Sequence, residues 1–82
     1  MAAEQNKQNL QDVFLNSVRK SGMMVTIHIT NGFMIKNAVI ISFDNYAILA
    51  ESDGKQMLIY KHAVSTITPD KKVELNRNTE NV

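Results

Sequence analysis

The sequence of 82 residues contains no cysteine, so it can form neither a disulfide bond nor a thiolate metal site. A chain without cysteine also suits a reducing compartment, and we expect a cytoplasmic protein. No apolar run approaches the roughly 20 residues of a membrane span, and the polar segment 1–8 lacks the apolar core of a signal peptide. The sequence therefore predicts one small domain with no membrane partner.

Residues that support catalysis are also scarce. The two histidines, His28 and His62, lie far apart along the chain and match no metal-binding spacing. Neither Ser42 nor Ser65 stands in the pattern of an activated nucleophile, and no glycine-rich phosphate loop is present. We therefore expect no enzyme activity, no cofactor, no metal and no small-molecule substrate.

Charge of one sign does not dominate, because the formal net charge is only +1 at pH 7. Global basicity therefore does not indicate a nucleic-acid partner, and only a local cluster of cations can do so. A domain this small buries a limited fraction of its surface and is marginally stable alone. Without disulfides, self-association is the expected source of further stability.

The pattern that is present begins with one helix. Asn9 can cap a helix, and Leu10, Phe14 and Val18 recur with the spacing of an apolar helical stripe. The pattern predicts a helix over residues 9–20.

From residue 24 the apolar period changes to two, which indicates strands. Asn31-Gly32 is a typical hairpin turn, and Pro69 ends the last strand because it cannot donate to a ladder. The expected strands are 24–30, 33–43, 46–51, 56–61 and 63–68. Strands this short and bent predict a mainly β domain built as a small, closed or nearly closed antiparallel barrel.

The domain is expected to occupy residues 9–69. Segment 1–8 is predicted to be a flexible lead, and segment 70–82 a disordered tail, because both are polar and the tail has no apolar period. The apolar run 39–41 breaks the period of two, so we expect either burial on both faces or a bulge there.

Five motifs, taken in order, resemble the Hfq family of bacterial Sm-like RNA chaperones, in the version found in Gram-positive bacteria. The motifs are Leu10-Gln11-Asp12, Asn31-Gly32, Ser42-Phe43-Asp44, Gly54-Lys55-Gln56 and Tyr60-Lys61-His62. The resemblance covers roughly residues 9–69. It implies an Sm-like, strongly bent five-stranded barrel and a homohexameric ring, closed by pairing of the fourth strand with the fifth strand of the next subunit.

The resemblance also implies two faces that bind single-stranded RNA. The residues that match the proximal, U-rich site are Gln11, Asn45, Tyr46, Lys61 and His62. The residues that match the distal, A-rich site are His28, Asn31, Gly32, Phe33, Met34, Lys36, Gln56 and Thr66. A basic outer rim matches Asn16, Arg19 and Lys20, with Gly22 at its third basic position. Asp12 is expected to orient Lys61 or nearby backbone.

The second strand departs from the family pattern. It carries one residue more than typical members, and Asn37-Ala38 replaces the usual glycine. An extra residue reverses the two faces of a strand unless a bulge absorbs it. His28 also replaces the usual tyrosine or phenylalanine, and it is a weaker stacking partner.

The implied function is to hold small regulatory RNAs and mRNA on one ring and promote their pairing in post-transcriptional regulation. Plainer interpretations exist for the single residues: Tyr46 as a half-buried strand residue, Lys61 as a solvated edge residue and His62 as a structural contact at a subunit boundary. The alternative function is an Sm-like ring that serves mainly as a protein scaffold with weakened RNA affinity, which the balanced charge and the altered second strand favour.

Overall fold

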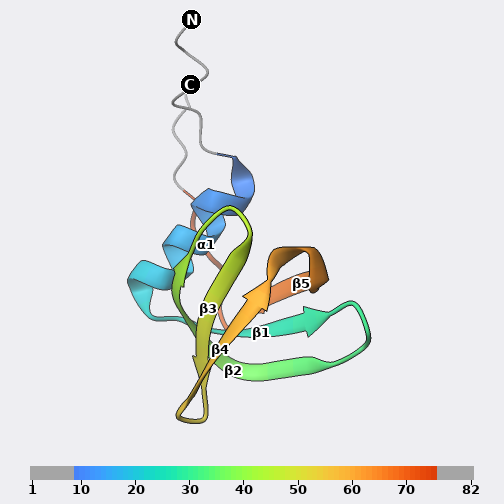
Figure 1. Ribbon diagram of the computed structural model, residues 1–82. Helices are drawn as coiled ribbons and strands as arrows, with labels where there is room; N and C mark the ends of the chain where they lie inside the picture. Colours follow the sequence, from blue (N-terminus) through green and yellow to red (C-terminus); the bar gives the residue numbers. More distant parts are fainter. Residues whose placement is uncertain (1–8, 76–82) are drawn as a thin grey trace, which may run out of the picture.

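The computed structural model describes residues 9–75, which form one helix and five strands (Figure 1). A single 3-10 turn, η2, separates the last two strands. The elements are α1 (Leu10–Ser21), β1 (Met24–Ile29), β2 (Met34–Phe43), β3 (Ala47–Ser52), β4 (Lys55–Tyr60), η2 (Lys61–Ala63) and β5 (Val64–Pro69). The predicted fold class and element order are confirmed. The sequence predicted only one residue between the strands 56–61 and 63–68, and this is wrong, because the three residues of η2 separate β4 from β5.

Local signals set both ends of α1. The Asn9 side chain accepts a hydrogen bond of 2.8 Å from the backbone N–H of Asp12, as an N-cap does. Gly22 ends the helix with φ 69°, a left-handed conformation that glycine adopts without steric cost. Val18 of the predicted stripe and the adjacent Leu15 are fully buried and Phe14 packs against the core, whereas Leu10 at the helix start is 52% exposed.

All five strands belong to one antiparallel sheet with the order β4-β3-β2-β1-β5. The chain forms a meander through β4, and β5 then crosses to pair with β1 rather than with β4. Figure 1 shows the sheet strongly curled, with α1 lying across one end. Within residues 9–75, β4 and β5 are the two edge strands, and each has one unpaired side.

A bulge in β2 absorbs one residue opposite β1. Val25 pairs with Ala38, but two residues later Ile27 pairs with Ile35, so β2 contains one residue more than β1 over this stretch. As a result Ile35 and Ala38, three positions apart, both face inward, and Ala38 is fully buried. The sequence left open how the extra residue of the second strand is accommodated, and the structure has a bulge here.

Asn37 takes the special conformation that this bulge requires. Its φ is 56°, in the left-handed region that asparagine tolerates better than most residues. The Ser52 hydroxyl donates a hydrogen bond of 2.8 Å to the Lys36 carbonyl oxygen, which gives this carbonyl a partner beside the bulge. Asparagine can therefore occupy this position although glycine is the residue without a steric penalty.

A second irregularity bends β2 near its end. Ile40 pairs with Ala50, and the next pair is Ser42 with Leu49, so Ile41 has no partner on β3. Ile40 is buried, whereas Ile41 is 36% exposed. Burial on both faces is thus wrong for this run, and the bulge that was the alternative is confirmed. The extra residue rotates Ile41 out of the core and bends the strand.

The core lies between α1 and the concave side of the sheet. Its buried residues are Leu15, Val18, Val25, Ile27, Ala38, Ile40, Ile48, Ala50 and Ile59. After β5 the Asp70 N–H donates to the Met24 carbonyl at 2.9 Å, and Val73 packs against this core. Within residues 9–75, no helix combines the length and the hydropathy needed to cross a membrane. The predicted lead 1–8 and positions 76–82 of the predicted tail lie outside the described residues, and the division into lead, domain and tail stays a prediction.

Candidate nucleic-acid interface

The residues that match the U-rich site line one open cleft of about 500 Å³. They come from three separate elements: α1, the loop between β2 and β3, and the corner at η2. The lining residues are Gln11, Asn45, Tyr46, Lys61 and His62, with Tyr60 as a sixth. The structure therefore brings together every residue that was predicted for this site.

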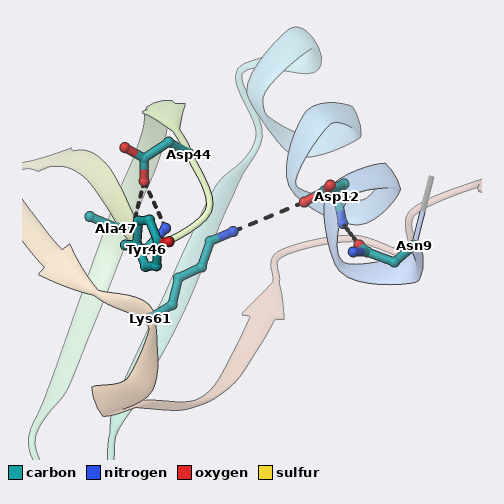
Figure 2. A network of polar contacts seen from close by, with 6 residues as sticks. All are labelled: Asn9, Asp12, Asp44, Tyr46, Ala47 and Lys61. Atoms are coloured by element: carbon teal, nitrogen blue, oxygen red, sulfur yellow. Dashed lines mark hydrogen bonds and ion pairs between the residues drawn. The ribbon is translucent and has the colours of Figure 1, made fainter. Parts of the chain in front are cut away.

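The loop between β2 and β3 is organised by Asp44 (Figure 2). Its Oδ1 accepts hydrogen bonds from the N–H of Tyr46 at 2.8 Å and of Ala47 at 2.9 Å, which closes an Asx turn. These two N–H groups lower the pKa of Asp44 because they stabilise the carboxylate, and the N–H of Tyr46 has the larger effect. Desolvation opposes this lowering, and the positive charge of Lys61 adds a smaller one. Tyr46 is 76% exposed in this turn, so its ring is free to stack.

Backbone hydrogen bonds hold the corner at η2 against this loop. The Lys61 N–H donates to the Tyr46 carbonyl at 2.8 Å, and the Thr30 N–H donates to the Ala63 carbonyl at 2.8 Å. The first bond joins the corner to the β2–β3 loop, and the second joins it to the end of β1. The backbone that carries Lys61 and His62 is therefore held in place by these hydrogen bonds.

The Lys61 side chain is positioned from two sides. Its Nζ lies 4.0 Å from Oδ1 of Asp12 and 5.4 Å from the ring centroid of Phe43, and the side chain is only 13% exposed. Figure 2 shows it extending from the corner toward the first turn of α1. The expectation that Asp12 orients Lys61 is confirmed. An ammonium group has three N–H donors, so a pair with Asp12 leaves donors for a ligand.

Tyr60 belongs to the motif Tyr60-Lys61-His62 but was not among the residues matched to the U-rich site. It lines the cleft, and its ring stacks with that of His62 at a centroid distance of 6.0 Å and an interplanar angle of 20°. The motif itself was an available signal, because Tyr60 directly precedes Lys61 and His62 in the chain.

Three residues of the predicted A-rich site form one row across the sheet. His28 of β1 pairs with Thr66 of β5 on one side and with Met34 of β2 on the other. Paired residues of antiparallel strands share a face, so these side chains lie together.

The Asn31-Gly32 turn joins β1 to β2 beside this row. Gly32 has φ 94°, and its N–H donates to the Ile29 carbonyl at 2.9 Å. The Asn31 side chain accepts from the Phe33 N–H at 2.9 Å, and Phe33 is 66% exposed. An exposed ring beside a tight turn can stack on a base.

The remaining two residues of that prediction are less close to the row. Lys36 is exposed at the β2 bulge. Gln56 lies on β4, in register with Glu51, at the other edge of the sheet from β5. Within one chain the structure does not bring Gln56 to the row of His28.

The three predicted rim residues lie on α1. Arg19 donates a hydrogen bond to the Asn16 side chain, and Arg19 and Lys20 are exposed in the last helical turn. Gly22 is the C-cap, so the third rim position supplies a turn instead of a cation. Within residues 9–75, no group of His, Asp or Glu side chains is arranged to hold a metal ion.

Comparison with known proteins assigns the family. The model of the Hfq protein family matches residues 10–74. The RNA-binding protein Hfq of Clostridium acetobutylicum is 56% identical over 69 residues, which is 84% of either chain. The RNA-binding protein Hfq of Alkaliphilus metalliredigens is 61% identical over 64 residues, which is 78% of this chain and 79% of the relative. A crystal structure described as the pleiotropic translational regulator Hfq superposes with a TM-score of 0.71 at 45% identity, covering 73% of this chain and 98% of that one. By its sequence and by its Sm-like fold, this chain belongs to the Hfq family.

Proposed function

We propose that this chain assembles into a homohexameric ring that binds single-stranded RNA and acts as an RNA chaperone in the cytoplasm. One face holds U-rich ends of small regulatory RNAs, and the other holds A-rich segments of mRNA. The observation that carries the proposal is the cleft in which a stacking ring, a cation and amide side chains from three elements converge. The names of the relatives, RNA-binding protein Hfq, support the same function.

The cleft suits uridine in particular. The exposed Tyr46 ring offers a face on which a base can stack, and Gln11 and Lys61 offer donors to the uracil edge. His62 and Lys61 can also meet a phosphate or a 2′-hydroxyl, the group that separates RNA from DNA. These stacking and hydrogen-bonding contacts are sufficient to hold a flat pyrimidine in an open cleft.

Two features support the ring. The edge strands β4 and β5 each have an unpaired side, and pairing between copies removes both exposed edges. On β4, Leu58 is 59% exposed, and beside β5 an apolar groove of about 480 Å³ includes Phe14 and Ile67. Burial of this apolar surface would supply the stability that a small domain lacks.

The same pairing supports the A-rich face. If β5 of one subunit lies beside β4 of the next, Gln56 of the neighbouring copy joins the edge that carries Thr66. The row of Met34, His28 and Thr66 then continues across the boundary between the two subunits instead of ending at β5. The amide of Gln56 has both a donor and an acceptor for an adenine edge.

An RNA chaperone needs no chemistry of its own in this scheme. Two strands held on opposite faces of one ring are confined to a small volume, so their effective concentration rises and pairing is favoured. The function therefore follows from binding and geometry.

A salt titration of nuclease-treated protein against one U-rich and one A-rich labelled oligomer tests the proposal. Both oligomers should bind, and the affinity should fall as salt rises because cations on the protein replace the counterions of RNA. Native mass spectrometry should give six times the chain mass of 9.2 kDa. Binding of only the U-rich oligomer would reject the A-rich face.

Binding of neither oligomer would favour the alternative, a ring that serves as a protein scaffold. The near-balanced charge of the chain is the observation behind this alternative. The ultraviolet spectrum of protein purified at low salt discriminates further. The chain has no tryptophan and two tyrosines, so co-purified RNA would dominate the absorbance.

A further inference from the structure

The stacked pair of Tyr60 and His62 occupies the cleft between the corner and the β2–β3 loop. The centroid distance of 6.0 Å and the angle of 20° lie within the range of offset-stacked aromatic pairs. Tyr60 is 54% exposed, so its ring is not part of the core and faces the cleft instead.

Within one chain, little else holds the His62 ring. It is exposed and lies in η2, a single turn of three residues. Within residues 9–75, no side-chain hydrogen bond or ion pair involves its imidazole. A free imidazole would sample several rotamers, and ordering it on binding would cost entropy.

Lys61, between the two aromatic residues, does not disturb the stack. Its side chain extends toward Asp12 and Phe43. The corner therefore presents two separately positioned groups: a cation fixed by an ion pair, and an imidazole fixed by a stacked ring.

We propose that Tyr60 is a positioning residue for U-rich RNA, which holds the His62 imidazole in its binding orientation before the RNA arrives. The proposal rests on the function proposed above and adds a residue to its U-rich site. Removing the Tyr60 ring should weaken U-rich binding by about threefold to tenfold, the range that an aromatic pair supports. Tyr60→Phe retains the stacking ring, so it should recover most of the affinity that Tyr60→Leu loses.

A double-mutant cycle tests whether Tyr60 acts through His62. U-rich affinity is measured for the full chain, Tyr60→Leu, His62→Ala and the double variant, each confirmed as an assembled ring by native mass spectrometry. The expected result is that Tyr60→Leu costs affinity when His62 is present and costs nothing further in the His62→Ala background. An equal loss in both backgrounds overturns the proposal, because Tyr60 then contacts RNA directly or acts on the structure as a whole.

A second measurement needs no variant. In the unmodified RNA-free protein, nuclear Overhauser contacts between the Tyr60 ring and the His62 imidazole should be present, with ring-current shifts of the imidazole protons. Their absence overturns the proposal even if a variant fails to assemble. Failure of the proposed function is distinguishable, because then the full chain itself would not bind the U-rich oligomer.

Discussion

The Nζ of Lys61 lies 4.0 Å from Oδ1 of Asp12, so an ion pair joins the first turn of α1 to the corner between β4 and β5. The same carboxylate belongs to a helix start that Asn9 caps, and the same ammonium lies near the Phe43 ring. One side-chain contact thus connects the helix to the part of the sheet that carries the cleft (Figure 2).

Loss of this ion pair should have a small effect on stability. Asp12→Asn is expected to lower the free energy of unfolding by up to about 1 kcal/mol, because the carboxylate is 41% exposed and water screens the pair. Asp53→Asn is the matched control, since it neutralises a carboxylate in a turn whose φ of 57° asparagine also tolerates. Chemical denaturation measures both variants, and high salt should reduce the difference. An equal loss in the two variants would contradict a role for the pair.

Removal of the exposed ring at the cleft should weaken U-rich binding selectively. Tyr46→Ala is expected to cost about 1–3 kcal/mol, roughly fivefold to 150-fold in affinity, the value of one stacked base. The hexameric ring of subunits should stay assembled because Tyr46 is 76% exposed. Tyr46→Phe should retain stacking. Lys61→Ala should also weaken U-rich binding. Unchanged affinity in both alanine variants, measured by fluorescence anisotropy, would reject this cleft as the U-rich site.

Removal of the exposed ring beside the Asn31-Gly32 turn should have the opposite selectivity. Phe33→Ala is expected to weaken A-rich binding by roughly fivefold to 150-fold, because one stacking surface is lost. U-rich binding should not change, since Phe33 does not line the cleft. Together with Tyr46→Ala this gives a crossed pair of variants in one binding assay. Equal effects of Phe33→Ala on both oligomers would argue against two separate faces.

The left-handed residue of the β2 bulge should determine which substitutions are tolerated there. Asn37→Ala is expected to lower the free energy of unfolding by about 1 kcal/mol, because alanine keeps the Cβ that is strained at a φ of 56° but lacks the short polar side chain with which asparagine tolerates this region. Asn37→Gly should be near neutral, and Lys36→Ala is the control at the adjacent bulge position. Urea denaturation of the three variants measures the effect. A neutral Asn37→Ala would show that the bulge takes another conformation in solution.

Asp44 should make stability depend on pH in acid. Its pKa is lowered in the folded state from the ordinary value of 3.8, chiefly by the N–H groups of Tyr46 and Ala47. A depressed carboxyl pKa stabilises the fold above the unfolded-state pKa, and this contribution is lost as pH falls from about 5 through the folded-state pKa.

An NMR titration of the Asp44 carboxyl checks this directly, and its midpoint should lie below 3.8. Asp44→Asn keeps an oxygen that can accept both N–H groups but cannot ionise, so it should flatten the acid limb of the stability curve. A midpoint at or above the ordinary value, or an unchanged acid limb in Asp44→Asn, would contradict the role assigned to these hydrogen bonds.

Much of the fold was predictable because its signals are local. Asn9 and Gly22 mark the ends of α1, and Asn31-Gly32 marks the first hairpin, since caps and tight turns depend on backbone preferences within a few residues. The change of apolar period from helix to strand also lies within short windows of sequence. The residues of the U-rich cleft came from the family resemblance, and the structure places them together.

The sequence by itself thus determined the elements, their order and the family motifs. Only the tertiary structure decided that β5 pairs with β1 and leaves β4 as the other edge, and that Tyr60 stacks on His62 within the cleft. It also decided that Asn37 absorbs the additional residue of β2 opposite β1. Strand partners, bulge positions and side-chain stacks depend on contacts between residues distant in sequence and on how the whole core packs, and no local pattern contains that information.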